Sequence, residues 1–369
     1  MRIGIEASRA NRPVKTGVEW YAWHVIQGMK ELPAASKHEW KLYTNEALTG
    51  GLEELPPNWK ESRLRWFPKY LWTQLRLSWE MTQRPPEVLF VPAHVLPRFT
   101  PKKSVVTVHD VGFKRFPELY KKIQVAYHEI TTRDIVKKNA RIITVSEFCK
   151  QEIIELYGAK PENIFVTHLG FDHARYFPQP KKAGEKPYIL FVGRIDKKKN
   201  LLTLVRAFEQ IAEAFPDLEL KLAGTFSGPA GLATTGSAEL QQAIRDSRFT
   251  SRIKLLGYIS EDEKPSLLSN ALMYVQPSIY EGFGLPPLEA MACGTPTICA
   301  DSTSLPEIVG RANALFFDPN SVEQLAAHIT QLVNSEEKRN ELIQKGLEWS
   351  KRYDWKKTAA ETLAILESW

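Results

Sequence analysis

The 369-residue chain contains only three cysteines, and their positions (Cys149, Cys293 and Cys299) lack the spacing of a metal-ligand cluster. Scattered cysteines in odd number exclude a disulfide framework and predict buried free thiols in a reducing compartment. No segment approaches the roughly 18 apolar residues of a membrane-spanning helix. The first residues, MRIGIEAS, predict a β-strand rather than a signal peptide, because they lack a long apolar stretch and a small-residue cleavage site. We therefore expect a cytoplasmic protein.

Neither sign of charge dominates the chain. The 49 Lys and Arg residues stand against 43 Asp and Glu residues, which gives a net charge of +6. Residues 1–175 carry 27 basic and 19 acidic side chains. A basic front half could suit an acidic acceptor or a membrane surface, but a modest excess is more typical of a solubility feature. We expect no nucleic-acid partner.

The chain is long enough for two domains, and short β-branched runs alternate with helical patterns, which predicts parallel sheets with crossover helices. Residues 177–186, rich in Pro, Lys and Gly, predict a linker. We expect one domain over residues 1–176, a second over 186–352 and a final amphipathic helix over 353–369. The expected strands are 2–5, 40–43, 88–91, 104–108, 141–145, 164–167, 188–192, 219–223, 253–256, 273–276, 297–300 and 314–317. Ligands bind such sheets at the carboxyl ends of the strands.

The most informative stretch is YEGFGLPPLEAMACG, residues 280–294. It places Glu281 and Glu289 eight positions apart, with two glycines and a Pro-Pro pair between them. Glycine lets the backbone approach a ligand closely, and proline suits the first turn of a helix. We expect a helix over residues 287–292 whose free amides form an anion site beside both carboxylates. A sugar joined to a diphosphate would need such a site.

The longer run QPSIYEGFGLPPLEAMACGTPTICADSTSLPEIVG, residues 276–310, resembles the E-x7-E signature of retaining glycosyltransferases with the GT-B fold. This group 1 family includes bacterial mannosyltransferases and glucosyltransferases of polysaccharide assembly. The resemblance implies an α/β protein in which two doubly wound Rossmann-like domains face a cleft. It also implies a donor site that includes the loop residues Gly282, Phe283, Gly284 and Leu285. The residues alone leave open a loop and helix with two solvated glutamates.

A second candidate element is GRIDKKKN, which follows the apolar run 188–192 and places Arg194 five residues before Lys199. Arginine offers a planar fork of donors and lysine a point charge, and both strengthen hydrogen bonds to phosphate. The family carries Arg and Lys at this spacing, so the resemblance implies that both bind the donor's phosphates. A solvated basic turn is the alternative, and we expect Lys197 and Lys198 to face solvent.

Three further residues are assigned by resemblance. His109 ends the apolar run VVTVHD, and in the family a histidine in this position contacts the donor sugar from the opposite domain. A hydrogen-bonded packing histidine is the alternative. Gly17 precedes an expected helix where the family has a Gly-rich phosphate turn, although only one glycine remains here. Tyr258 is expected near the nucleobase, with an ordinary half-buried aromatic as the alternative.

Residues 59–84, WKESRLRWFPKYLWTQLRLSWEMTQR, interleave four tryptophans with six basic residues. Aromatic rings among cations are typical of a membrane interface. They would also suit contact with a sugar or a nucleic-acid base. A helix whose tryptophans pack inward while its cations face water explains the pattern equally well. We retain peripheral membrane contact through this segment as a hypothesis.

The residues and the resemblance together predict a retaining transfer of a hexose, with mannose from GDP-mannose as the first choice, to a glycan or lipid-linked acceptor in polysaccharide biosynthesis. In this hypothesis Glu281 and His109 hold the sugar and Glu289 holds the ribose. No metal or other cofactor is expected, because the chain lacks an Asp-x-Asp triplet and any zinc-like ligand spacing. Another GT-B enzyme (a phosphorylase or a sugar-nucleotide epimerase) and a non-catalytic glycan-binding module are the alternatives.

Overall fold

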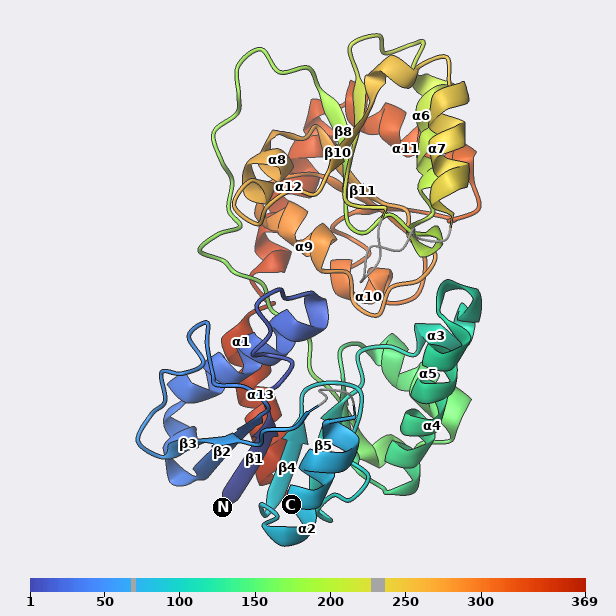
Figure 1. Ribbon diagram of the computed structural model, residues 1–369. Coiled ribbons are helices and arrows are strands. Elements are labelled where there is room, and N and C mark those ends of the chain that lie inside the picture. Colours follow the sequence, from blue (N-terminus) through green and yellow to red (C-terminus); the bar gives the residue numbers. More distant parts are fainter. Residues whose placement is uncertain (68–70, 227–235) are drawn as a thin grey trace. The chain divides into compact units, whose positions relative to one another are not determined.

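The computed structural model describes residues 1–67, 71–226 and 236–369, and the chain divides into two compact units (Figure 1). Unit 1 contains Met1–Gly170 together with Asp354–Trp369, and unit 2 contains Phe171–Tyr353. Each unit is built on one parallel sheet. Among the described residues, no helix is both long and apolar enough to cross a membrane.

Unit 1 has a seven-stranded sheet in the order β3-β2-β1-β4-β5-β6-β7. Its strands are β1 (Arg2–Glu6), β2 (Glu39–Thr44), β3 (Trp59–Arg63), β4 (Val88–Val91), β5 (Ser104–Thr107), β6 (Arg141–Thr144) and β7 (Ile164–Val166). Its α-helices are α1 (Gly17–Glu31), α2 (Ser78–Gln83), α3 (Gly112–Arg115), α4 (Lys122–Lys137), α5 (Glu147–Tyr157) and α13 (Trp355–Glu367). The last helix packs on the first, where the rings of His24 and Trp355 stack with centroids 4.6 Å apart.

Unit 2 has a six-stranded sheet in the order β10-β9-β8-β11-β12-β13. Its strands are β8 (Tyr188–Val192), β9 (Glu219–Ala223), β10 (Ile253–Gly257), β11 (Met273–Gln276), β12 (Thr297–Ala300) and β13 (Leu315–Phe317). Its α-helices are α6 (Leu201–Ile211), α7 (Ser237–Asp246), α8 (Lys264–Asn270), α9 (Leu285–Ala292), α10 (Leu305–Val309), α11 (Val322–Asn334) and α12 (Glu336–Ser350). The central strands β8, β11 and β12 are buried throughout, as parallel strands covered on both faces should be.

The strand orders define one switch point in each sheet, the place where successive connections leave in opposite directions. It lies between β1 and β4 in unit 1 and between β8 and β11 in unit 2. In open parallel sheets the crevice for ligands forms outside the carboxyl ends of the strands at this point. The loops that follow these strands are therefore where each unit can build a site.

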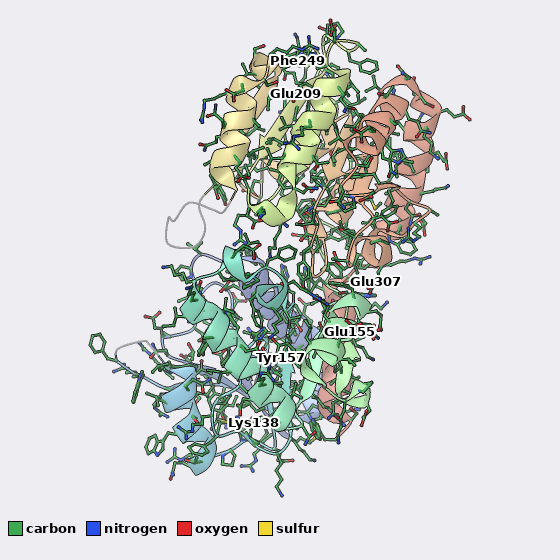
Figure 2. The ribbon with its side chains drawn as sticks, turned by 90° about the vertical axis from the view of Figure 1, so that its right-hand side faces the viewer. Lys138, Glu155, Tyr157, Glu209, Phe249 and Glu307 are labelled. Carbon is green, nitrogen blue, oxygen red and sulfur yellow. The ribbon has the colours of Figure 1, made fainter. Side chains whose placement is uncertain are left out.

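Helices α4 and α5 form the outer layer on one side of unit 1 (Figure 2). The Tyr157 hydroxyl of α5 donates to Glu129 Oε2 of α4 at 2.9 Å. Lys138, just after α4, donates to the carbonyls of Pro97 and Arg98 at 3.1 and 2.8 Å. These bonds tie the two helices to each other and to the loop between β4 and β5.

The packing alternative for residues 59–84, a helix with its tryptophans inward and its cations toward water, does not describe the segment. The segment contains strand β3, a π-helical turn (Thr73–Leu77) and helix α2, and residues 68–70 lie outside the described part. Trp59 and Trp72 are buried, whereas Trp66 and Trp79 are exposed. The prediction of buried free thiols is confirmed, because Cys149, Cys293 and Cys299 are all buried and unpaired to one another.

Candidate functional site

Two loops meet at the switch point of unit 2. The loop after β8 carries the GRIDKKKN sequence, and the loop after β11 leads through Glu281 to helix α9. The backbone N–H of Ile279 donates to the carbonyl of Lys198 at 2.9 Å, which joins the two loops directly. This contact brings the lysine turn and the first signature glutamate to the same edge of the sheet.

Glu281 is the centre of a polar cluster at this edge. Its Oε1 atom accepts from Lys199 Nζ at 2.6 Å, from Gln276 Nε2 at 2.6 Å and from Ser278 Oγ at 2.7 Å. The side chains of Lys199 and Glu281 are 17% and 13% exposed, so the pair is only partly open to water. No donor among the described residues reaches the second oxygen, Oε2. The carboxylate is thus held in one orientation with an acceptor to spare.

The loop around Glu281 rests on a Ser-Thr-Ser turn after β12. Thr303 has a φ of +52°, and its hydroxyl accepts from the Glu281 backbone N–H at 3.0 Å. The Ser304 hydroxyl donates to the carbonyls of Glu281 and Phe283 at 3.0 and 2.9 Å. Gly284 has a φ of +102°, a backbone conformation that residues with a side chain rarely adopt, and a Cβ there would lie 2.9 Å from Leu305 Cδ2. The glycine is required by the turn itself.

Helix α9 begins two residues earlier than expected, at Leu285 instead of residue 287. Pro286 and Pro287 therefore occupy its second and third positions and remove two of the backbone donors of the first turn. The expected anion site therefore has fewer free backbone N–H donors than an ordinary helix start. Its donors come from Gly284, Leu285 and the loop before them.

Glu289 lies in the middle of α9 and is paired inside the protein. Its Oε2 atom is 2.6 Å from Lys264 Nζ, and the two side chains are only 8% and 11% exposed. Burial alone would lower the pKa of Lys264, but the carboxylates of Glu289 and Glu261 raise it above its usual value. The Tyr176 hydroxyl in turn donates to Glu261 Oε2 at 2.7 Å. The second signature glutamate is thus fixed by a buried ion pair with helix α8.

Tyr274 lies near both signature glutamates. Burial raises the pKa of its hydroxyl, and the negative charges of Glu281 and Glu289 raise it further. Its hydroxyl donates to Gln276 Oε1, which turns the amide nitrogen of Gln276 toward Glu281. Both signature glutamates therefore act on the same buried tyrosine.

Arg194 and Lys199 lie on the same loop but have different partners. Arg194 Nε donates to Asp196 Oδ2 at 3.0 Å, and its guanidinium is about half exposed. The other Asp196 oxygen, Oδ1, is buried without a hydrogen-bond partner among the described residues. Lys197 is exposed, as expected, whereas Lys198 is half-buried, with its Nζ 5.7 Å from the centroid of the Tyr280 ring.

The loops beyond β9 and β10 close the other side of this edge. A Cβ at Gly224 would lie 1.8 Å from the Gly193 carbonyl oxygen, so only glycine allows these backbones to approach. Gly224 N–H donates to the Gly257 carbonyl at 2.7 Å. The next residue, Tyr258, is 77% exposed rather than half buried. Its side chain is available to a ligand, and its role at a nucleobase stays a prediction.

The two site residues expected in unit 1 lie at separate elements. His109 follows β5, where its Nε2 atom is 3.5 Å from the Pro92 carbonyl and its ring meets that of Tyr21 edge to face at 4.7 Å. Burial lowers the pKa of His109, which favours a neutral imidazole. Gly17 is the first residue of α1, and a Cβ there would meet nothing within 4 Å. The Glu19 carboxylate accepts from Thr16 N–H at 3.2 Å and so already occupies this helix start.

Sequence reasoning missed several residues that shape the site in unit 2: Asp196, Lys264, Gln276, Ser278, Thr303 and Ser304. A polar Gln276 at the end of an otherwise apolar strand is a pattern that could have indicated its role. Lys264 gave no comparable sign, because its partner Glu289 is 25 positions away on another helix. In the parts of the chain that the structure describes, no group of three or more His, Cys, Asp or Glu side chains is placed to hold a metal ion.

Comparison with known proteins agrees with this architecture. Residues 172–349 match the family model described as Glycosyl transferases group 1, and residues 16–175 match the model described as Glycosyltransferase Family 4. The chain belongs to the group 1 glycosyltransferases. The GT-B fold expected from the sequence is confirmed.

A relative and two solved structures illustrate the match. The O-antigen chain mannosyltransferase B of Escherichia coli is 30% identical over 298 residues, which cover 78% of this chain and 76% of that protein. The sucrose-phosphate synthase of Thermosynechococcus elongatus has a TM-score of 0.76 at 19% identity, covering 99% of this chain and 98% of its own. Anabaena HepE, solved in complex with UDP and glucose, has a TM-score of 0.72 at 18% identity over 100% of both chains.

Proposed function

We propose that this glycosyltransferase moves a hexose from a nucleoside diphosphate sugar to a glycan or lipid-linked acceptor in polysaccharide synthesis, with retention at the anomeric carbon. Mannose from GDP-mannose is the first choice of donor. The name of the E. coli relative supports mannose, and the UDP and glucose bound to the Anabaena protein support a nucleotide-sugar donor. In this proposal unit 2 binds the donor and unit 1 contributes the acceptor side.

The observation that carries the proposal is the Lys199–Glu281 pair at the switch point of unit 2. A carboxylate held by three donors on one oxygen can accept a sugar hydroxyl on the other without rearranging. Lys199, Arg194 and the amides of Gly284 and Leu285 supply positive charge and donors for a leaving diphosphate. A cation beside a hydroxyl-binding carboxylate fits the junction between a sugar and its diphosphate.

The remaining roles follow from chemistry and position. We assign Glu281 to the hydroxyls of the donor sugar, Glu289 to the ribose, and His109 to the donor sugar as a neutral donor or acceptor. The acceptor hydroxyl attacks on the face from which the diphosphate departs, and a phosphate oxygen takes its proton. The new glycosidic bond forms as the bond to the diphosphate breaks, so an α-linked donor yields an α-linked product.

Stereochemistry tests the retaining part of the proposal. Proton NMR of the first-formed product from an α-linked sugar nucleotide should show an α anomer. A β anomer would overturn it.

Donor binding should not depend on a divalent metal, since the sequence has no Asp-x-Asp triplet and the switch point supplies cations of its own. Calorimetric titration with GDP and with UDP should give the same dissociation constants with and without EDTA. Loss of nucleotide binding in EDTA would show that donor binding requires a metal ion.

We also propose that unit 1 contacts an anionic membrane through a surface that we call the Trp79 patch: the exposed side chains Leu75, Trp79 and Phe99 with the cations Arg98 and Lys102. The Phe99 N–H donates to Ser78 Oγ at 2.7 Å, which joins the loop to α2. Arg98 lies 5.9 Å from the Phe99 ring centroid. Rings bordered by cations suit the headgroup region of a bilayer.

Vesicle sedimentation tests this contact. The protein should sediment with phosphatidylglycerol vesicles, and high salt should release it because surface charges are screened. Trp79→Ser should weaken sedimentation, whereas Trp20→Ser, on an exposed tryptophan outside the patch, should not. Equal sedimentation with neutral and anionic vesicles, or none with either, would show that the Trp79 patch does not bind anionic membranes.

A further inference from the structure

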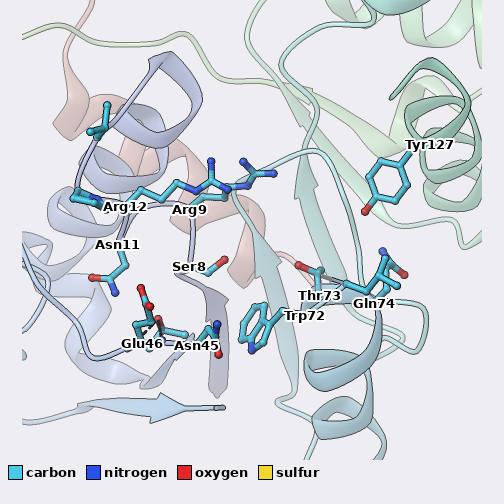
Figure 3. Close-up of a pocket in the computed structure, with 14 residues that line it drawn as sticks. Ser8, Arg9, Asn11, Arg12, Asn45, Glu46, Trp72, Thr73, Gln74 and Tyr127 are labelled. Carbon is cyan, nitrogen blue, oxygen red and sulfur yellow. Dashed lines mark hydrogen bonds between the residues drawn. The ribbon is translucent and has the colours of Figure 1, made fainter. Parts of the chain in front are cut away.

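Unit 1 contains a cavity of about 680 Å³ at the carboxyl ends of β1 and β2, beside the β1/β4 switch point (Figure 3). Its volume is within the range of small-molecule sites. Apart from members of the 59–84 segment, none of the residues singled out in the sequence lines it. Its walls come from the loop after β1, the loop after β2, the segment that begins at Leu71 and helix α4.

One wall of the cavity is cationic. Arg9 and Arg12 both lie against a single oxygen of buried Glu19, with Nη1–Oε1 distances of 3.3 and 3.2 Å. Their side chains are 44% and 52% exposed, and each guanidinium has five N–H donors. One carboxylate oxygen shared by two guanidiniums leaves several of their N–H donors unused. Figure 3 shows both side chains extending over the cavity from the same side.

The floor of the cavity is aromatic and fixed. Trp72 is buried, and its Nε1–H donates to the Leu64 carbonyl at 2.8 Å, so the indole cannot rotate away. Asn11 is held at both ends, by the Ala47 carbonyl at 2.8 Å and the Thr49 N–H at 2.8 Å. Rigid walls of this kind reduce the entropy lost when a ligand binds.

The opposite wall supplies a hydroxyl, and the rim is apolar. Tyr127 of α4 points its hydroxyl toward the cavity (Figure 3). Val14 and Leu71 at the rim are 80% and 57% exposed. An aromatic floor with hydroxyl and amide groups around it suits a sugar ring, because a ring has apolar C–H faces and polar hydroxyl edges.

We propose that this cavity binds a sugar that carries one anionic substituent, a phosphate or a carboxylate, with the charge on Arg9 and Arg12 and the ring against Trp72. The inference rests on the proposed function, in which the ligand is the acceptor. Glu46 on the cavity wall and Glu19 together balance the two arginines, so an anionic group would be held by guanidinium N–H donors and not by a net positive charge, which favours a singly charged substituent over a diphosphate. That distinguishes the ligand from the nucleotide part of the donor.

Calorimetric titration of the full chain with glucose 1-phosphate, glucuronate and glucose tests the proposal. One or both of the anionic sugars should bind at least ten-fold more tightly than glucose, and the preferred one identifies the substituent. Arg12→Gln should weaken that binding about ten- to a hundred-fold, the scale of a lost charge-assisted hydrogen bond. Arg133→Gln, which also removes a half-exposed arginine paired to a glutamate but lies outside the cavity, should leave it unchanged.

A second variant guards against misfolding. Tyr127→Phe removes one hydroxyl from a half-exposed side chain and should weaken binding about three- to ten-fold. Both variants should retain GDP or UDP binding, because that assay reports on unit 2. If a nucleotide binds but glucose binds as tightly as both anionic sugars, the cavity proposal fails and the proposed function stands. The same holds if a nucleotide binds and none of the three sugars does. If no nucleotide binds either, the proposed function itself fails.

Discussion

The two units place polar groups at equivalent points of similar sheets, yet the charges are arranged in opposite ways. At the switch point of unit 1, two arginines share the buried carboxylate of Glu19, which also caps the start of helix α1. At the switch point of unit 2, one carboxylate, Glu281, gathers Lys199 and two neutral donors, while two prolines open helix α9. In unit 1 the protein fills its own helix start with an anion.

This difference shows that topology determines where a ligand can bind and the local residues determine which ligand binds. The Glu19 carboxylate at the start of α1 disfavours a second anion there, so we expect anion binding in unit 1 at the exposed ends of Arg9 and Arg12. In unit 2 the glutamate lies in the loop before the helix, which leaves the amides of Gly284 and Leu285 to a ligand. We therefore expect nucleotide binding in unit 2 alone.

The largest effect should come from Glu281→Gln. Gln has the same shape but no charge, so its oxygen holds Lys199 weakly and accepts poorly from a sugar hydroxyl. Turnover should fall about 10²–10⁴-fold in steady-state assays, the range seen when a charged group in contact with the reacting sugar is lost. Calorimetry should show GDP or UDP binding as in the wild type, since this side chain is assigned to the sugar. Glu323→Gln, at an exposed position of helix α11, is the matched control.

Lys264→Met should break the buried pair in unit 2. Removing one partner of such a pair costs about 3–5 kcal/mol of unfolding free energy, which denaturant titration can measure. Nucleotide affinity should fall as well, because Glu289 is assigned to the ribose and loses the cation that positions it. Lys264→Arg keeps the charge and should keep both the stability and the affinity. Unchanged stability and affinity in Lys264→Met would contradict this role of Lys264.

Acid should destabilise unit 1. Burial lowers the pKa of His94 to about 3 and also lowers those of His109 and His128. The unfolded chain binds these protons near pH 6.5, whereas the folded chain binds them only at lower pH. The free energy of unfolding is therefore full above about pH 6.5 and falls below it by about 1.4 kcal/mol per pH unit for each such histidine, until the folded group is protonated.

Tryptophan fluorescence can follow this transition in one unit, because nine of the ten tryptophans belong to unit 1. The free energy of unfolding by this probe should be level above about pH 6.5 and decrease from there to pH 4. His94→Gln should reduce the slope. A pH-independent value would show that the histidines are not held neutral.

Arg194→Ala should weaken nucleotide binding by about 1.5–3 kcal/mol, the contribution of a charge-assisted hydrogen bond to phosphate. Its guanidinium is already oriented by Asp196, so little ordering is needed when the ligand arrives. Calorimetry with GDP and UDP measures the change. An unaltered dissociation constant would remove Arg194 from the donor site, and Arg245→Ala on α7 serves as the control.

The smallest expected effects are those of two Gly→Ala substitutions on stability. Gly284→Ala must place a side chain at a φ of +102° against Leu305, and it should cost about 1–3 kcal/mol of stability. Gly17→Ala meets nothing and lies at a helix start, so it should be neutral or stabilise by up to about 1 kcal/mol. Thermal unfolding of both variants gives the comparison. A loss of nucleotide affinity in Gly17→Ala would instead support the phosphate contact expected from the resemblance.

Most strands could be predicted from the sequence because buried parallel strands read as continuous apolar runs. The expected bounds of β8, β9, β11 and β12 agree with the structure. Strand β3 was missed because it lies at the edge of its sheet, where WKESR exposes most of its side chains. Pairing with β2 makes it a strand, and no local pattern reports that pairing.

The site was predictable only where its residues are neighbours in sequence. The loop with Glu281 and the turn with Lys199 each carry a recognisable pattern, and the structure joins those two side chains. The partners that set their chemistry, such as Thr303 beneath Glu281 and Lys264 beside Glu289, come from other elements. Long-range pairing is a property of the folded sheet, and the sequence of one chain does not display it.

The most direct test of the central claim, a sugar-nucleotide site at the switch point of unit 2, is hydrolysis of donors in the absence of an acceptor. The purified full chain should be incubated with GDP-mannose, GDP-glucose, UDP-glucose and UDP-galactose, and the released sugar followed by proton NMR. We expect the wild type and the Glu323→Gln control to release free sugar slowly from at least one donor, fastest from GDP-mannose, and Glu281→Gln to release none. Equal release by Glu281→Gln, or no release from any donor, would show that unit 2 has no such site.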